Sequence, residues 1–219
     1  MKVLYKNGEA NGPGAAYLPT GKLYFETNWL NGRMEGKYVE YYENGHRRTE
    51  TFVKSGKRDG TTKSYGPDGA LKEEVTYKNG QMHGPFKRYD SRGSLEFEKT
   101  YINGALNGPL KSYYPSGKLR MEVNYLDNKQ QGKETMYYET GELRVETDYK
   151  DGKEYGLTRI YYKSGKIKTE ATYKDGKEHG TRKTYYENGA LAGQAMVIDK
   201  AIIGLKLYDR DGKLKPRQP

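Results

Sequence analysis

Apolar and polar residues alternate along short runs that recur through the chain. Taking every second residue from Leu119 gives Leu119, Met121, Val123 and Tyr125, while the residues between them are charged or polar. A period of two is typical of a β-strand with one half-buried face and one face in water. Equivalent runs are found in every part of the chain up to about residue 197. The sequence therefore predicts many short strands and no helix.

Two kinds of turn signal separate these strands. The first follows a pair of tyrosines, as in residues 113–117 (YYPSG) and 185–189 (YYENG), and its glycine supplies the positive φ of a tight hairpin turn. The second is Asn-Gly or Asp-Gly with another glycine four residues later, as in residues 79–84 and 175–180. We expect this second signal to make a longer connection between hairpins. The runs between turns have about five to eight residues, a normal strand length.

The hairpin unit repeats with one fixed period. A glycine opens each unit at intervals of 24 residues, at Gly12, Gly36, Gly60, Gly84, Gly108, Gly132, Gly156, Gly180 and Gly204. A tyrosine follows five residues after it, at Tyr17, Tyr41, Tyr65, Tyr89, Tyr113, Tyr137, Tyr161 and Tyr185. A glutamate row completes the unit, at Glu26, Glu50, Glu74, Glu98, Glu122, Glu146 and Glu170. Such self-similarity predicts an array of supersecondary units.

The predicted fold class is therefore all-β. We expect one elongated, twisted antiparallel sheet of tandem hairpins, similar to a solenoid, with about sixteen strands plus terminal pieces. Twist should coil this sheet into a trough whose concave side carries the large side chains. The predicted divisions are an N-terminal half repeat (1–11), tandem 24-residue repeats (12–189), a degenerate C-terminal capping repeat (190–214) and a tail (215–219). The cap is inferred from Gln194, which breaks the glutamate row, and from Asp199-Lys200, where the Asn/Asp-Gly turn is lost.

Composition changes this picture little but excludes several classes of site. Only 33% of the 219 residues are hydrophobic, yet 23 are tyrosines at regular intervals, so we expect stability to come from local contacts between neighbouring units. The chain has no cysteine, which excludes disulfides, thiolate zinc sites and a cysteine nucleophile. The sequence contains neither an apolar signal-peptide core nor a run of about 18 apolar residues. The compartment stays open, either cytoplasmic or exported with its signal removed.

The unit Gly-x4-Tyr-Tyr-x-x-Gly-x-Leu-x-x-Glu-x-x-Tyr-x-Asn-Gly resembles the MORN repeat, in particular the variant of bacterial multi-repeat proteins. The resemblance covers about residues 3 to 197. It implies an elongated sheet of stacked hairpins without a catalytic set of residues. Members of this family are described as protein-interaction scaffolds, as binders of membranes or phosphoinositides and, for the bacterial variant, as antitoxin components. Departures from the pattern are Arg47, Gly66, Asp90 and Asn128.

The tyrosine column is the strongest candidate feature. A side chain repeated at one strand position can stack on its copies in neighbouring hairpins, which is a structural role. The functional alternative is a tyrosine-lined trough that presents rigid contact area to a partner. The candidate binding tyrosines are Tyr41, Tyr65, Tyr89, Tyr113, Tyr137 and Tyr161.

A basic row accompanies the tyrosines, two positions earlier and on the same face. Its members are Lys63, Lys87, Lys111, Arg159 and Lys183. Basic residues interleaved with aromatic ones suit single-stranded nucleic acid. The alternative, which we favour, is a solvated ladder of charge pairs with the glutamate row, including Arg120 with Glu122 and Arg144 with Glu146. The net charge of +10 favours acidic partners in general, whether protein, anionic lipid or polyanion.

The sequence gives little support for an enzyme. The three histidines, His46, His83 and His179, have no neighbouring ligands at metal-binding spacing, and no phosphate-binding Gly-Lys-Ser/Thr occurs. We expect no catalytic residues, metal, cofactor or small-molecule substrate.

The predicted function is that of a binding or scaffold module for another protein, of the antitoxin type according to the resemblance. The alternative is binding of anionic membrane lipid or a polyanion, including single-stranded nucleic acid. An exposed terminal strand allows either a monomer or an edge-to-edge dimer.

Overall fold

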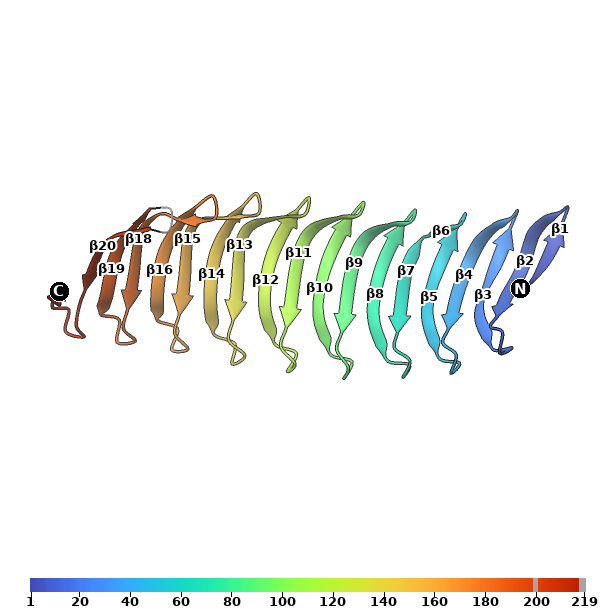
Figure 1. Ribbon diagram of the computed structural model, residues 1–219, viewed down its shortest axis with the longest axis horizontal. Coiled ribbons are helices and arrows are strands. Elements are labelled where there is room, and N and C mark those ends of the chain that lie inside the picture. The colour runs from blue at the N-terminus through green and yellow to red at the C-terminus, as the bar shows by residue number, and fades with distance from the viewer. Residues whose placement is uncertain (199–200, 217–219) are drawn as a thin grey trace. The chain divides into compact units, whose positions relative to one another are not determined.

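The computed structural model describes residues 1–198 and 201–216, and these form twenty β-strands without a helix (Figure 1). Consecutive strands pair antiparallel. The short strands β6 and β7 both pair with β5, and β17 and β18 both pair with β16, so each of these two pairs is one interrupted strand. The predicted all-β array of tandem hairpins is confirmed.

The chain divides into two compact units, residues 1–107 and 108–219. The strands that begin in unit 1 are β1 (Lys2–Lys6), β2 (Glu9–Tyr17), β3 (Leu23–Leu30), β4 (Arg33–Tyr41), β5 (Arg47–Lys54), β6 (Lys57–Arg58), β7 (Gly60–Tyr65), β8 (Leu71–Lys78), β9 (Gln81–Tyr89), β10 (Leu95–Ile102) and β11 (Ala105–Tyr113), of which β11 continues into unit 2. Unit 2 adds β12 (Leu119–Leu126), β13 (Lys129–Tyr137), β14 (Leu143–Lys150), β15 (Lys153–Tyr161), β16 (Ile167–Lys174), β17 (Lys177–Glu178), β18 (Gly180–Tyr185), β19 (Leu191–Ile198) and β20 (Ala201–Leu207).

The two turn signals exchange the roles that the sequence predicted. Asn79 and Gly80 both have positive φ, 51° and 85°, and they form a two-residue turn because Lys78 pairs with Gln81. Two consecutive residues of positive φ define the tight hairpin turn that suits twisted strands. The connection after the tyrosine pair is the longer one, since Tyr41 pairs with Arg47. The prediction of a longer connection at Asn-Gly was wrong.

A β-bulge interrupts every hairpin and changes the predicted alternation. In β11 and β12, Lys111 lies opposite Glu122 and Ser112 opposite Met121, but Tyr113 lies opposite Leu119. Directly opposed residues project to the same face of a sheet. Leu119 is therefore out of line with Met121, which the simple period of two does not predict.

The strands present two different faces. We call the face with the Tyr113, Lys111 and Glu122 rows the ladder face, and the opposite face, with the rows of Val123 and Tyr125, the core face. The Val123 row is well buried at seven of its positions, at 0 to 7% exposure: Thr27, Thr51, Val75, Val123, Thr147, Ala171 and Ala195. The core of this single-layer sheet is thus centred on one row of mostly small side chains.

The C-terminal segment ends in an exposed strand. Residues 190–214, predicted to be a cap, include β19, β20 and a bend that brings Leu214 opposite Tyr208. The side chains of β20 are exposed along its whole length. Residues 199–200 of the predicted cap and 217–219 of the predicted tail lie outside the described residues. The capping role stays a prediction.

Candidate binding faces

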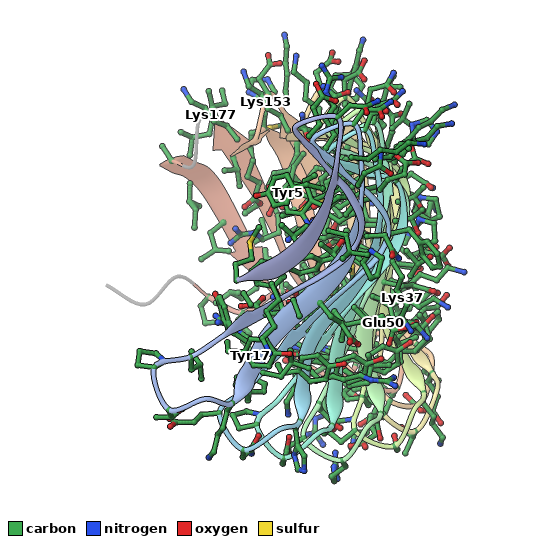
Figure 2. The ribbon with its side chains drawn as sticks, turned by 90° about the vertical axis from the view of Figure 1, so that its right-hand side faces the viewer. Tyr5, Tyr17, Lys37, Glu50, Lys153 and Lys177 are labelled. Atoms are coloured by element: carbon green, nitrogen blue, oxygen red, sulfur yellow. The ribbon has the colours of Figure 1, made fainter. Side chains whose placement is uncertain are left out.

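On the ladder face, each glutamate of the row can join two groups. Its first partner is a cation from the same hairpin, such as Lys37, whose Nζ lies 2.8 Å from Glu50 Oε1 (Figure 2). The predicted cross-strand ladder is thus present. Further pairs of this kind are Lys63–Glu74 at 3.2 Å, Lys111–Glu122 at 3.4 Å, Lys133–Glu146 at 3.2 Å and Arg159–Glu170 at 3.0 Å.

The second partner of the glutamate is a tyrosine hydroxyl from the following hairpin. The donors and acceptors are Tyr41 to Glu26 at 2.6 Å, Tyr89 to Glu74 at 2.8 Å, Tyr161 to Glu146 at 2.6 Å and Tyr185 to Glu170 at 3.1 Å. Burial, followed by the bond to the carboxylate, raises the pKa of Tyr41, Tyr89 and Tyr161 to about 12. The tyrosine column therefore connects neighbouring repeats through its hydroxyls.

All the binding residues that the sequence predicted lie on this face. Within the described residues, and leaving Tyr113 aside, none of these tyrosines stacks on another aromatic ring. Hydroxyl bonds such as that from Tyr161 to Glu146 take the place of the predicted stacking. Lys87 lies opposite both Glu98 and Glu74, and Lys183 lies opposite Glu170 and Gln194. Tyr65 and Tyr137 occupy the same row, but neither hydroxyl bonds a glutamate within the described residues. The binding role of these residues stays a prediction.

The same-strand charge pairs were predicted wrongly. Glu122 takes its ion-pair partner, Lys111, from across the hairpin, and Glu146 takes Lys133 in the same way. Arg144 lies instead over the ring of Tyr138, 6.0 Å from its centroid. Arg48 and Lys168 lie in the same way over Tyr42 and Tyr162.

The second tyrosine of the pair makes another connection between repeats. Its hydroxyl donates to the backbone carbonyl of the first tyrosine in the next repeat, at 2.6 to 2.8 Å for Tyr42, Tyr114, Tyr138 and Tyr162, and Tyr186 bonds Tyr208 at 2.9 Å. Leu18, Gly66 and Asp90 occupy this position in unit 1 and cannot make the bond. The repeats of unit 2 are therefore joined by more of these hydroxyl bonds than the repeats of unit 1.

The core face of unit 2 carries a different tyrosine row. Tyr125, Tyr149 and Tyr173 lie opposite Gln130, Glu154 and Glu178. In the described part of the chain, the hydroxyls of these three tyrosines make no hydrogen bond. Burial raises the pKa of Tyr149 to about 12, with the carboxylates of Glu134 and Glu154 adding to the effect.

Glu134 is the most unusual group on this face. Its exposure is only 7%, and it accepts one hydrogen bond, from Gln130 Nε2 at 3.2 Å. Burial and then the charge of Glu154 raise the pKa of its carboxyl. Glu178, by contrast, is held by Arg182, whose Nε donates to it at 2.6 Å. Within the described residues, Glu134 and Glu154 have no cation as an ion-pair partner.

A shallow hollow lies beside this row. Its volume is about 280 Å³, and its lining combines apolar side chains with hydroxyls and a guanidinium: Thr158, Ile160, Thr169, Ala171, Tyr173, Arg182 and Thr184. These residues come from β15, β16 and β18. The hollow is large enough for one side chain of a partner but small for a cofactor.

The core face of unit 1 has the opposite charge at its aromatic groups. Lys99 occupies the buried row, and its ammonium lies 4.7 Å from the ring centroid of Phe86, 5.5 Å from Phe97 and 5.3 Å from Tyr101. Arg88 lies over Phe97 at 5.1 Å. Cations over ring faces are stabilised by the ring quadrupole. The rings of Phe86, Phe97 and Tyr101 are thus occupied by the chain's own cations.

Exposed lysines gather at the end of the strands where the two-residue turns lie. In unit 2 these are Lys129, Lys150, Lys153, Lys174 and Lys177, which we call the lysine edge. The lysines lie close to the turns of the next hairpin, since a Cβ added at Gly152 would lie 3.8 Å from Lys129 Cβ and one added at Gly176 3.9 Å from Lys153 Cβ. Figure 2 shows Lys153 and Lys177 projecting from the same end of the strands. Lysines 24 residues apart are separated by two strand spacings, or about 10 Å.

Sequence reasoning missed the core-face tyrosines and Lys99 as distinct features. The tyrosines recur every 24 residues, so their period could have identified them, but they were grouped with the apolar strand pattern. Lys99 stands where the other repeats have threonine, valine or alanine, and alignment of the units would have shown it.

Other kinds of site are missing from the described residues. No group of His, Cys, Asp or Glu among them could hold a metal ion. None of them forms a helix that is long and apolar enough to cross a membrane.

Comparison with known proteins agrees with this geometry. The family model described as MORN repeat variant matches residues 34–54, 58–79, 82–103, 106–127, 130–151, 154–175 and 178–199. No curated protein matches the chain. MORN repeat proteins are generally binding modules and not enzymes. Seven tandem matches cover well over half of the chain, which therefore belongs to the MORN repeat variant family.

Proposed function

We propose that this chain is a protein-binding module and that the core face of unit 2 makes the contact. The observation that carries this proposal is the row of Tyr125, Tyr149 and Tyr173, whose hydroxyls have no partner within the described residues. Tyrosine offers rigid contact area at low entropic cost, and its hydroxyl usually finds a hydrogen-bond partner when an interface buries it.

The ladder face is the weaker candidate for the interface. Its hydroxyls, carboxylates and ammonium groups bind one another, as in Tyr161–Glu146–Lys133. A partner on that face would have to replace bonds that already hold the repeats together. On the core face, a partner would satisfy groups that the chain leaves unbonded.

The charges of the core face indicate the chemistry of the partner. Among the residues that the structure describes, Glu134 and Glu154 have no ion-pair partner, and the hollow that Tyr173 helps to line combines apolar side chains with hydroxyls. We expect the partner to supply a basic side chain at the two carboxylates. A toxin neutralised by this chain, which the family resemblance implies, is one case of such a partner.

A matched pair of variants tests the assignment of the face. Tyr149→Ala truncates the core face and Tyr137→Ala the ladder face of the same hairpin, and both tyrosines are half-buried. The immobilised chain is used to retain partners from its host, which are identified by mass spectrometry. We expect Tyr149→Ala to reduce retention of the specific partner at least tenfold and Tyr137→Ala to preserve it, with circular dichroism confirming both folds. The reverse result would move the site to the ladder face.

The lysine edge favours a second candidate function, binding of anionic lipid or a polyanion. Regularly spaced exposed ammonium groups neutralise phosphates, and such binding weakens steeply as salt increases. The test compares vesicles with anionic headgroups, zwitterionic vesicles and single-stranded DNA at about 50 and 200 mM salt.

The control for this second function comes from the ladder face. Changing Lys129, Lys153 and Lys174 to alanine should abolish binding to the anionic probes. Changing Lys63, Lys111 and Arg159 to alanine should leave it intact, because these cations are already paired with glutamates. Binding that survives the first triple variant excludes the lysine edge.

A further inference from the structure

The strand β20 is exposed along its whole length, which among the described strands is otherwise true only of the two-residue strand β6. Ile202 is 54% exposed, Ile203 60% and Leu205 49%. Elsewhere in the array, strands of this type contribute side chains to the packed core row or to the ladder. An exposed strand with apolar side chains on both faces is a template for further pairing.

The outer edge of β20 is largely unpaired. On its inner side β20 pairs with β19, from Gly193 opposite Leu207 to Ile198 opposite Ala201. On its outer side, within the described residues, the chain folds back only at the end of the strand. There the amide of Lys215 donates to the carbonyl of Leu207 at 2.8 Å. Alternate backbone groups between Ile202 and Lys206 therefore face outward on this edge, which includes the register shift at Ile203.

The opposite terminal strand has charges that protect it. The strand β1 reads KVLYK, with lysine at both ends, and edge lysines are a common device against unwanted pairing. The strand β20 reads AIIGLKL, with Lys206 as its one charge. In a chain of net charge +10, a strand with so little charge is the segment where two copies can approach most closely.

We propose that two copies of this chain pair antiparallel through Ile202–Lys206 of β20. In a two-fold pairing centred on Gly204, Ile203 lies opposite the partner's Leu205, and Ile202 opposite the partner's Lys206. The pairing joins aliphatic side chains and keeps the two ammonium groups apart. It also continues the hydrogen-bond ladder that already links the strands of unit 2.

Two alternative registers are less favourable. A pairing centred on Lys206 would oppose two ammonium groups, which destabilises an antiparallel pair. One centred on Leu205 would require the backbone of Leu207, whose carbonyl is already bonded to Lys215. The Gly204 register avoids both problems. A Cβ at Gly204 would meet no atom within 4 Å, so this position tolerates a side chain.

Because the chain has no cysteine, a single introduced thiol tests the register directly. Directly opposed residues in antiparallel strands have Cα atoms about 4.5 to 5.5 Å apart, within disulfide range. Gly204→Cys should therefore form a covalent dimer under mild oxidation. Ile202→Cys is the control, because its two copies would lie more than about 13 Å apart. Linking at Ile202 and not at Gly204 would overturn the register.

The unmodified chain tests the dimer itself by sedimentation or light scattering. A pairing of five residues is small compared with stable interfaces of about 1,200 Å² or more, so the mass should increase with concentration. The dimer fraction should also rise with salt, which screens the repulsion between two basic chains. A monomeric mass at all concentrations, together with no covalent dimer of Gly204→Cys, would refute the proposal.

Charged substitutions complete the test. Leu205→Lys should shift the chain to the monomer and, being exposed, should leave the circular dichroism unchanged. Phe52→Lys, at a site 54% exposed in unit 1, is the matched control and should keep the dimer. An equal loss of dimer in both variants would contradict pairing through β20.

Discussion

Two glutamates of the hairpin formed by β13 and β14 have opposite environments on its two faces. Glu146, on the ladder face, accepts hydrogen bonds from the Tyr161 hydroxyl at 2.6 Å and from Lys133 at 3.2 Å. These partners, the tyrosine hydroxyl most of all, lower the pKa of its carboxyl. Glu134, on the core face, accepts a hydrogen bond only from Gln130 within the described part of the chain, and burial raises the pKa of its carboxyl.

The difference separates the contacts that hold the repeats together from the groups that we propose for binding a partner. On the ladder face, polar groups satisfy one another between successive repeats, so their pattern must recur. On the core face, Glu134 carries a desolvation cost that the chain itself does not offset. Groups that are present although they lower the stability of the fold are expected at functional sites. The same contrast applies to Tyr161, whose hydroxyl is bonded, and Tyr149, whose hydroxyl has no hydrogen bond to any described residue.

The largest effect is expected where the core face is most deeply packed. Val123→Asp would place a carboxylate at a fully buried site without a partner and should cost about 3 kcal/mol or more. Asn124→Asp, at the exposed neighbouring position, should change the free energy of unfolding by less than about 0.5 kcal/mol. Urea unfolding of both variants measures this difference. Similar costs at the two sites would contradict the division into a packed and a wet face.

A smaller effect distinguishes the bonded tyrosines from the unbonded ones. Tyr138→Phe removes the hydroxyl that bonds the Tyr161 carbonyl and should cost about 1 to 1.5 kcal/mol. Tyr149→Phe removes no hydrogen bond to a described residue, so the free energy of unfolding should change by less than about 0.5 kcal/mol. It should nevertheless weaken retention of the partner. Thermal unfolding and the partner assay, measured on the same samples, should thus respond to different variants. A stability loss in both would show that the core-face hydroxyl is bonded in solution.

Substitution of the two glutamates should change stability in opposite directions. Glu146→Gln weakens two charged hydrogen bonds at a half-buried site and should cost about 0.5 to 1.5 kcal/mol at neutral pH. Glu134→Gln keeps the shape of the side chain, removes an unpaired buried charge and should stabilise the chain by up to about 1 kcal/mol. The free energy of unfolding at pH 7 measures both. If both variants lose stability, Glu134 has a cationic partner in solution.

The hairpin array could be predicted from the sequence because its causes are local. Alternation with a period of two defines the strands, and glycine with asparagine or aspartate defines the turns, as at Asn79-Gly80. Both signals lie within a few residues of the structure that they determine. Repetition over eight units removed the ambiguity that a single hairpin would have left.

The two faces were harder to predict because they depend on bulges. The shift of register after Ser112 brings Tyr113 opposite Leu119, and the repeat spacing contains no sign of it. Where a tyrosine of the ladder face bonds a glutamate, that glutamate comes from the preceding hairpin, 15 residues away, as in Tyr161 and Glu146. Spacing showed that these side chains recur together, but it could not distinguish ring stacking from hydrogen bonding.

The smallest expected effect concerns acid, where the two glutamates titrate on opposite sides of the ordinary value of 4.5. The pKa of Glu146 is lower in the folded chain, so its contribution to stability is present above pH 4.5 and is lost as the pH falls through its folded pKa. The pKa of Glu134 is higher in the folded chain, so its contribution is present below pH 4.5 and is lost as the pH rises through its folded pKa. Stability should therefore fall less steeply in acid for Glu146→Gln than for the unmodified chain, and more steeply for Glu134→Gln. Carboxyl carbon shifts measured by NMR between about pH 2 and pH 7 give both pKa values directly. Two midpoints on the same side of 4.5 would mean that the faces do not differ in the way that their contacts indicate.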